Sequence, residues 1–316
     1  MRQKSRLESL YNFPWMVYNA CQEQHKEGPY MEKRYLCIDV GGTELKAAPV
    51  DGTGALLAQP RYFPAGSDQE AGPLLDHFTQ IIRDTCPGQM DGVRMAFPGP
   101  FDYGSGICLL RGQDKYDKLY GVNLRQELSL RLDFPAEEIR FLNDADAFAM
   151  GEMGFGAAQG AARAMFICIG TGLGSGFGVD GHMAPAGTPG MPENGELFNI
   201  PFLDKRLDDY LSRRGLMALA REYLGEALDG RELAARVEQG EQRARDCWSA
   251  FGRRVRDALL PWLESFQPET LCFGGQITRS GGLFLPPVED ACQDLGIRVY
   301  VTEDTSVRAM QGLTRI

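Results

Sequence analysis

Two adjacent polar residues, Asn143 and Asp144, follow the apolar run 141–142 and are the first candidates for chemistry in this chain. On either side of them lies an apolar run that ends in glycines, upstream at 41–43 and downstream at 170–176. Glycine has no Cβ, so backbone N–H groups in such turns can approach phosphate oxygens closely. A carboxylate between two such turns predicts a base set between two halves of a phosphate-binding cleft, as in a small-molecule kinase.

Both features also have plainer structural explanations. The glycines of segment 41–43 could simply close a hairpin, and the two interpretations stay open for this segment. An Asn or Asp before a helix usually caps it, and residues 145–152 have a helical pattern. A cap accounts for one residue of the pair Asn143 and Asp144, but it does not explain why two such residues stand side by side.

Strand patterns alternate with helix patterns along the chain, which predicts an α/β protein. The second half repeats the opening of the first, because each begins with a buried strand, a glycine-rich turn and a return strand. The predicted strands are 35–40, 46–50, 56–57, 93–97, 139–142, 165–169, 176–179 and 270–273, and the predicted helices are 74–83, 123–132, 145–152 and 248–262.

Composition limits the classes of partner. The chain has 316 residues, enough for two lobes, and a net charge of −10, which disfavours a nucleic-acid or anionic-membrane partner. The eight cysteines form no Cys-x-x-Cys pair, so we expect free thiols in a reducing cytoplasm. No run has the length of a membrane span, and no signal peptide is recognisable. A cytoplasmic protein is therefore expected.

Several common nucleotide and metal motifs are missing from the sequence. No Gly-Lys dipeptide occurs, which excludes the P-loop signature. The three histidines, His25, His77 and His182, are followed by Lys, Phe and Met, so the protein-kinase catalytic loop and the His-Glu-x-x-His zinc motif are absent. The glycines of 170–178 never satisfy Gly-x-Gly-x-x-Gly in register, which disfavours a Rossmann dinucleotide site.

Four segments of the sequence, taken together, resemble the ROK family (repressors, open reading frames and kinases). They are Asp39-Val-Gly-Gly-Thr-Glu-Leu-Lys46, Phe97-Pro-Gly-Pro-Phe-Asp102, Asn143-Asp-Ala-Asp-Ala147 and Gly170-Thr-Gly-Leu-Gly-Ser-Gly176. This family belongs to the actin, hexokinase and heat-shock ATPase superfamily. The resemblance runs from about Tyr35 to the C-terminus. It implies an α/β, two-lobed actin-like (ribonuclease H-like) ATPase fold, with mixed sheets flanked by helices and an interlobe cleft.

We expect three regions in such a chain. Residues 1–30 form an N-terminal extension without a motif, 31–143 a small N-terminal lobe, and 144–302 a large C-terminal lobe. A C-terminal helix at about 303–316 is expected to pack back on the first lobe. By the family resemblance the protein would also be a homodimer.

The resemblance further implies which residues meet ATP and Mg²⁺. Asp39 would serve Mg²⁺ through bound water. Two glycine motifs would face the phosphates, and a third segment would lie beneath adenosine. The residues implied for ATP are Gly41, Gly42, Thr43 and Lys46 in the first motif, Gly170, Thr171, Gly172 and Gly174 in the second, and Gly274 and Gly275 beneath adenosine.

By the same resemblance Asp144 is the catalytic base, and Asn143 hydrogen-bonds a sugar hydroxyl beside it. Pro98 and Gly99 border the sugar, and Glu196 reaches one of its hydroxyls. The other residues implied for the sugar are Asn199 and Asp208.

The chain departs from the family pattern at its sugar end. Asn199 stands at the position of a family histidine, and no cysteine occurs between Cys168 and Cys247, so we expect no zinc site. Asp208 stands where the family has Glu and is one methylene shorter, which makes it a weaker candidate for the sugar.

The expected activity is that of a glucokinase-like ATP:hexose phosphotransferase, with the 6-hydroxyl as acceptor and ATP and Mg²⁺ as cofactors. One alternative is a β-glucoside (disaccharide) kinase, because family members resembling such kinases also lack the zinc loop. A second is a catalytically inactive sugar-binding regulator, suggested by Asn199. A DNA-binding regulator is disfavoured, since residues 1–30 show no helix-turn-helix pattern and the chain is acidic.

Overall fold

The computed structural model describes residues 33–86, 88–113, 115–193 and 195–316. The predicted extension at 1–30 lies outside the described residues. Internal contacts divide the chain into two compact units, the described residues up to Gly151 together with Ser306–Ile316, and Glu152–Thr305. The boundary therefore falls inside helix α5 (Asp144–Phe155) rather than at its start, where we expected it. A continuous helix carries no sequence signal for such a change of contacts.

The first unit is built on a five-stranded sheet in the order β3-β2-β1-β4-β7. Strand β1 pairs antiparallel with β2, which pairs antiparallel with β3, while β1, β4 and β7 run parallel. The strands are β1 (Arg34–Val40), β2 (Glu44–Asp51), β3 (Arg61–Pro64), β4 (Gly92–Phe97) and β7 (Ile139–Asn143). The strand predicted at 56–57 is wrong, because Leu56 makes only an isolated bridge to Val50.

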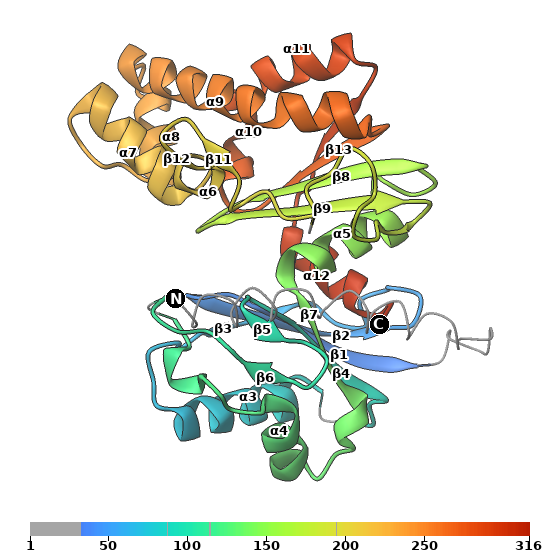
Figure 1. The fold of residues 1–316 in the computed structure, drawn as a ribbon. Coiled ribbons are helices and arrows are strands. Elements are labelled where there is room, and N and C mark those ends of the chain that lie inside the picture. Colours follow the sequence, from blue (N-terminus) through green and yellow to red (C-terminus); the bar gives the residue numbers. More distant parts are fainter. Residues whose placement is uncertain (1–32, 87, 114, 194) are drawn as a thin grey trace, which may run out of the picture. The chain divides into compact units, whose positions relative to one another are not determined.

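Alternation along β1 assigns its side chains to two faces of this sheet. Leu36, Ile38 and Val40 join the core cluster that contains Leu74 and Phe78 of α3. Figure 1 shows helices α3 (Ala71–Thr85) and α4 (Leu124–Leu132) covering one side of the sheet. The alternate residues, including Asp39, therefore point to the opposite face.

The second unit repeats this sheet order as β10-β9-β8-β13-β14. Strand β9 pairs antiparallel with β8 and β10, and β8, β13 and β14 run parallel. The strands are β8 (Arg163–Ile169), β9 (Leu173–Val179), β10 (His182–Met183), β13 (Thr270–Gly274) and β14 (Arg298–Val301). The predicted repeat of a strand, a glycine-rich turn and a return strand is confirmed.

Helices bury one face of the second sheet around an aromatic cluster. Trp248 stacks on Phe284 with ring centroids 5.7 Å apart, and Phe251 meets the same ring edge-on at 5.3 Å. The amphipathic helix predicted from these aromatics is confirmed and is part of α9, which Figure 1 shows beside α10 and α11. The helices of this unit are α6 (Leu207–Tyr210), α7 (Arg213–Leu224), α8 (Gly230–Glu238), α9 (Gln242–Phe266), α10 (Gly281–Phe284) and α11 (Pro286–Asp294).

Short elements complete both units. The first contains the ribbon β5 (Phe101–Asp102) and β6 (Ile107–Cys108), and the 3₁₀ turns η2 (Asp117–Leu119) and η3 (Ala136–Glu138). The second contains the ribbon β11 (Pro201–Phe202) and β12 (Lys205–Arg206), and the 3₁₀ turn η4 (Ile277–Ser280).

Helix α12 (Thr305–Leu313) packs closely on the first part of α5. A Cβ added at Gly151 would lie 1.9 Å from the Arg308 carbonyl oxygen, and one added at Gly312 would lie 2.0 Å from the Ala147 carbonyl oxygen. Each helix thus supplies a glycine where the other backbone approaches. No larger residue fits there unless the helices separate.

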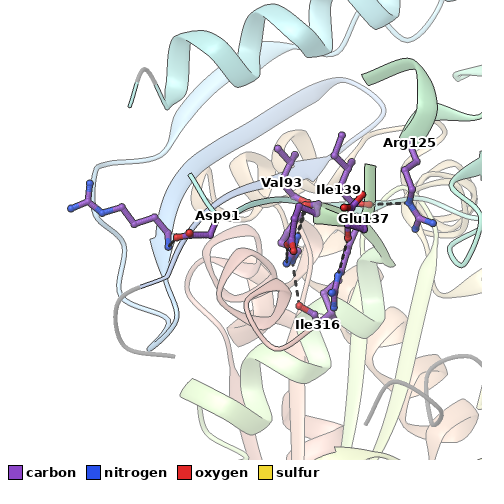
Figure 2. A network of polar contacts seen from close by, with 10 residues as sticks. Asp91, Val93, Arg125, Glu137, Ile139 and Ile316 are labelled. Atoms are coloured by element: carbon purple, nitrogen blue, oxygen red, sulfur yellow. Dashed lines mark hydrogen bonds and ion pairs between the residues drawn. The ribbon is translucent and has the colours of Figure 1, made fainter. Parts of the chain in front are cut away.

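The chain end is fixed to the first sheet by a buried arginine. Arg94 of β4 is 2% exposed, and it donates to the Glu138 carbonyl oxygen at 2.6 Å and to the Ile316 carbonyl oxygen at 3.3 Å. Figure 2 shows Ile316 joined to this network beside Val93. Burial and the nearby Arg140 lower the pKa of Arg94, so its backbone partners compensate a costly buried charge.

Candidate active site

The carboxyl ends of three parallel strands gather the predicted residues of the first unit at one sheet edge. Asp39 of β1 is in register with Ala96 of β4, and Phe97 of β4 with Asn143 of β7. Neighbouring strands lie about 4.8 Å apart. The segments that follow these strands, including Gly41–Thr43, therefore emerge at the same edge, the one at which open α/β sheets bind ligands.

At this edge, the junction of β7 and α5 separates the roles of Asn143 and Asp144. The Asn143 side-chain oxygen accepts hydrogen bonds from the Ala145 N–H at 2.9 Å and the Asp146 N–H at 3.3 Å, and so caps the helix. Asp144 is the first residue of α5, and its side chain is exposed. The Ala145 N–H also donates to Asp144 Oδ1 at 2.9 Å, so Asp144 shares in the cap through one oxygen, and its Oδ2 has no partner among the described residues.

The Asn143 side chain is held at its nitrogen as well. Its Nδ2 donates to the Tyr103 hydroxyl at 3.2 Å, and that hydroxyl donates to the Phe97 carbonyl oxygen at 3.0 Å. A Cβ added at Gly99 would lie 3.4 Å from the Tyr103 oxygen, so Pro98 and Gly99 lie close to this pair. An amide nitrogen carries two hydrogens, so one remains for a ligand. Sequence reasoning missed Tyr103, which stands in no recognisable motif.

Hydroxyl groups hold the carbonyls of the first glycine turn, Gly41–Thr43. The Gly41 oxygen accepts from the Tyr116 hydroxyl at 2.7 Å, and the Gly42 oxygen from the Ser67 hydroxyl at 2.8 Å. Tyr116 is fully buried, so this contact rests on the aromatic core. Neither residue was predicted, because their distance in sequence from the turn hides the contact.

The N–H groups of this turn remain available. Among the described residues, the N–H groups of Gly42 and Thr43 donate to no acceptor, and both residues are exposed. A Cβ added at Gly41 would lie 2.6 Å from the Glu44 carbonyl oxygen, so the turn requires glycine there. A turn with neighbouring unpaired N–H groups can bind an anion, which favours the phosphate interpretation over a plain hairpin.

Asp39 and Lys46 lie directly opposite each other across β1 and β2 and therefore share a face. Lys46 Nζ donates to the Ser306 hydroxyl at 2.7 Å and lies 5.7 Å from the centre of the Tyr62 ring. The Lys46 ammonium is thus bound to α12. Lys46 follows the first glycine turn closely in the sequence, but its side chain contacts another element. Burial and the negative charge of Asp39 together raise the pKa of Tyr116, the residue that holds Gly41.

The second glycine turn, Gly170–Gly172, is built in a similar way. Gly170 accepts from the Arg213 N–H at 2.8 Å, and the Leu173 N–H donates to Asp208 Oδ1 at 2.6 Å. Within the described part of the chain, the N–H groups of Thr171 and Gly172 have no acceptor, and both residues are exposed. Gly174, which we expected in the turn, is instead a strand residue of β9.

Gly274 ends β13, Gly275 follows it, and both lie beside the second glycine turn. Gly275 has φ +97°, and a Cβ added there would lie 2.4 Å from the Ile169 carbonyl oxygen. Its N–H donates to the Thr305 hydroxyl at 2.8 Å. The close approach and the positive φ both require glycine, so the two glycine segments of this unit lie at adjoining strand ends.

The backbone on both sides of Glu196, a residue predicted to bind sugar, is fixed by one hydroxyl. The Ser175 hydroxyl donates to the Gly195 carbonyl oxygen at 3.1 Å and accepts from the Leu197 N–H at 2.9 Å. Desolvation raises the pKa of the Glu196 carboxyl, although the side chain as a whole is exposed. Asn199 lies in the exposed turn that follows.

Asp208, the weakest sugar candidate, has protein partners at both carboxylate oxygens. Oδ1 accepts from the Leu173 N–H, and Oδ2 forms an ion pair with Arg214. The structure therefore connects Asp208 to the second glycine turn.

The described residues contain no group of three or more His, Cys, Asp or Glu side chains placed to hold a metal ion. Burial raises the pKa of Cys37 to about 12, so this thiol stays protonated. Helices in the described ranges also lack the combination of length and apolar character that crossing a membrane requires.

Known proteins similar to this chain include a sugar kinase and a repressor. The N-acetyl-D-glucosamine kinase of Haemophilus influenzae is 25% identical over 279 residues, covering 80% of this chain and 89% of the relative. The DNA-binding transcriptional repressor Mlc of Escherichia coli is 23% identical over 262 residues, covering 76% of this chain and 63% of the repressor. Relatives of both kinds therefore cover most of this chain.

A solved structure, the ROK family glucokinase of Streptomyces griseus in complex with glucose and AMPPNP, has a TM-score of 0.71 at 20% identity. It covers 89% of this chain and 98% of that chain, and so shows that the fold is shared. The sequence profile of the ROK family matches residues 35–311, nearly all of the part that the structure describes. The chain therefore belongs to the ROK family.

Proposed function

We propose that this protein is an ATP-dependent sugar kinase that transfers the γ-phosphoryl group of ATP to a hexose, with the 6-hydroxyl as acceptor. One observation carries the proposal. At the junction of β7 and α5, Asn143 caps the helix while Asp144 keeps an exposed carboxylate, at the sheet edge that also carries the turn Gly41–Thr43. A base and unpaired N–H groups at one edge suit phosphoryl transfer to a hydroxyl.

Asp144 acts as the general base in this proposal. The sugar hydroxyl oxygen forms a bond to the γ-phosphorus, the bond from that phosphorus to the bridging oxygen breaks, and ADP leaves. The hydroxyl proton passes to the Asp144 carboxylate. Such a base contributes about 10²–10⁴ in rate.

Backbone N–H groups bind the phosphates of ATP. Gly42 and Thr43 offer theirs in the first unit, and Thr171 and Gly172 in the second. The chain carries a net charge of −10, so local donors rather than the overall field must hold an anionic ligand. A carboxylate suits a hard cation, and Mg²⁺, when bound, neutralises phosphate charge, with Asp39 serving it through bound water.

The Asn143 amide and the Glu196 carboxylate bind sugar hydroxyls. The support is that both are fixed by neighbours, Asn143 by Tyr103 and Glu196 by Ser175, so that little side-chain and backbone freedom is lost on binding. The names of the relatives make N-acetylglucosamine and glucose the first substrates to test.

A second candidate function is that of a sugar-binding regulator without catalysis. The observation favouring it is Asn199, which stands where family kinases have histidine, together with the similarity to a repressor. The exposed Asp144 carboxylate favours the kinase, because binding alone does not require a base at that position.

The test is ADP release from ATP and Mg²⁺ with glucose, N-acetylglucosamine, mannose, fructose and cellobiose, using Asp144→Asn as control. Turnover on one sugar that is lost in the variant supports the kinase and identifies its substrate. Turnover confined to cellobiose would point to the β-glucoside kinase. Calorimetric binding of a sugar without ADP release on any of them would support the regulator instead.

A further inference from the structure

One carboxylate, from helix α6, holds the second glycine turn. Asp208 of α6 accepts the Leu173 N–H at 2.6 Å, immediately after the turn Gly170–Gly172. The same carboxylate pairs with Arg214 in the first turn of α7, and the neighbouring Arg213 N–H donates to the Gly170 carbonyl oxygen. The two ends of the turn are thus attached to the same pair of helices.

The fit between turn and carboxylate is close. A Cβ added at Gly172 would lie 3.0 Å from Asp208 Oδ1, so the turn can approach this oxygen only because the residue is glycine. The Asp208 backbone is fixed too, since its N–H donates to the Phe198 carbonyl oxygen at 3.2 Å and its carbonyl oxygen accepts from the Ser212 hydroxyl at 2.5 Å. The carboxylate therefore has a defined position against the turn.

Its partners also leave the carboxylate little capacity for a sugar. The Asp208 side chain is 18% exposed, Oδ1 meets Leu173, and Oδ2 meets Arg214. A sugar hydroxyl could use only the remaining lone pair of each oxygen, and the low exposure of the side chain limits access to it. We infer that Asp208 is a positioning residue, which fixes the Gly170–Gly172 turn for nucleotide phosphates and does not bind the sugar.

This inference rests on the proposed function, since it assigns the turn to the nucleotide. The N–H groups of Thr171 and Gly172, which have no acceptor among the described residues, lie between the two ends of the turn that Arg213 and Asp208 hold. When the Asp208 carboxylate is removed, the Leu173 N–H loses its charged acceptor and the turn must be ordered by the nucleotide itself. Nucleotide affinity should then fall, while sugar affinity should not.

The experiment compares Asp208→Ala, Asp208→Asn and Asp209→Asn with the wild-type protein. Asp209 is the matched control, because it also pairs with Arg214, at 3.0 Å, and caps the Arg206 N–H, at 3.2 Å, without touching the turn. The first readout is calorimetric binding of AMPPNP with Mg²⁺ in the absence of sugar. The second is the KM for ATP against the KM for the sugar that the panel identifies.

We expect Asp208→Ala to weaken AMPPNP binding and raise the KM for ATP roughly tenfold or more, because a hydrogen bond to a charged acceptor is lost. The KM for the sugar should stay near the wild-type value. Asp208→Asn keeps an oxygen that can accept the Leu173 N–H and should recover part of the affinity. Asp209→Asn should bind AMPPNP as the wild type does.

A rise in the KM for the sugar alone would overturn the inference and restore Asp208 as a sugar ligand. Equal losses for both substrates, or no loss at all, would also overturn it. Failure of the proposed function looks different: the wild-type protein would then release no ADP with any sugar. AMPPNP binding still decides the role of Asp208 in that case, because it needs no turnover.

Discussion

The two units use one sheet order but support their glycine turns differently. In the first unit the turn is held by neutral hydroxyls, from the buried Tyr116 and from Ser67. In the second it is held by the Asp208 carboxylate, itself paired with the partly exposed Arg214. One sheet topology therefore tolerates two solutions to the same geometric problem. The aromatic core fixes one turn, and a charged pair fixes the other.

The units also differ at the end of the third of their parallel strands and in the segment that follows it. In the first unit β7 ends at Asn143 and is followed by the exposed carboxylate of Asp144. In the second, the segment after β14 leads to Thr305, whose hydroxyl accepts the N–H of Gly275. The corresponding position thus serves the backbone in one unit and presents a carboxylate in the other. We therefore expect the catalytic base to come from the first unit.

The largest effect is expected when the Asp144 carboxylate, which distinguishes the two units, is removed. Asp144→Asn should lower kcat by about 10²–10⁴, because the amide cannot accept the hydroxyl proton. The matched control is Asp146→Asn, two residues further along the same helix. This change introduces the asparagine that the family motif has at that position. Steady-state ADP release measures both. Equal losses in the two variants would contradict the assignment of the base.

The next effect concerns the helix packing that holds the first unit. Gly151→Ala places a methyl group against the Arg308 carbonyl oxygen and should lower the free energy of unfolding by about 1–3 kcal/mol. Gly72→Ala in α3 is the control, because an added Cβ there meets nothing within 4 Å. Urea unfolding measures both, and a Gly151→Ala protein as stable as the control would show that the helices separate without cost.

The neutral support of the first turn gives a smaller effect. Tyr116→Phe keeps the buried ring but removes the hydroxyl that holds the Gly41 oxygen, a hydrogen bond worth about 0.5–1.5 kcal/mol. The KM for ATP should rise by a few-fold, less than in Asp208→Ala. Tyr120→Phe, at an exposed tyrosine, is the control. If Tyr116→Phe changed only the KM for the sugar, the assignment of this turn to the nucleotide would be contradicted.

Arg214, the ion-pair partner of Asp208, should contribute little to holding the second turn. The Arg214 side chain is 61% exposed, and exposed ion pairs contribute about 0–1 kcal/mol. Arg214→Ala should therefore change the AMPPNP dissociation constant by less than about fivefold, and the change should shrink in high salt. A loss as large as that of Asp208→Ala would mean that the pair, and not the hydrogen bond to Leu173, positions the turn.

The smallest expected effect is a pH dependence of stability at Glu196. Desolvation raises the pKa of this carboxyl in the folded state above its ordinary value. As pH rises, the unfolded chain ionises first, so the folded state loses stability between the unfolded and the folded pKa. Glu196→Gln removes this loss. In urea unfolding at both pH values, the variant should gain stability over the wild type near pH 7 but not near pH 4.

Sequence reasoning reached the elements whose signals are local. The strand before Asn143, the helix that begins at Asp144 and the glycine turns all follow from short patterns, and the order of four motifs gave the family. The contacts of Tyr116, Ser67 and Ser175 could not be predicted. A hydroxyl that holds a distant carbonyl leaves no periodic pattern and no motif in the sequence.

Two further differences have physical causes of the same kind. The unit boundary inside α5 has no signal, because a helix continues regardless of which sheet its sides contact. Asp208 was assigned by its resemblance to a family glutamate, but its partners depend on where its shorter side chain ends. Its neighbours Leu173 and Arg214 become visible only in the fold.

The central claim is that Asp144 accepts a proton and is not needed to hold the sugar. Calorimetric titration of the wild-type protein and Asp144→Asn with the sugar that the wild type phosphorylates tests it most directly. We predict dissociation constants within about threefold of each other, while turnover of the variant is lost, because a base acts in the transition state rather than in binding. A variant that no longer binds the sugar would contradict the claim and make Asp144 a sugar ligand.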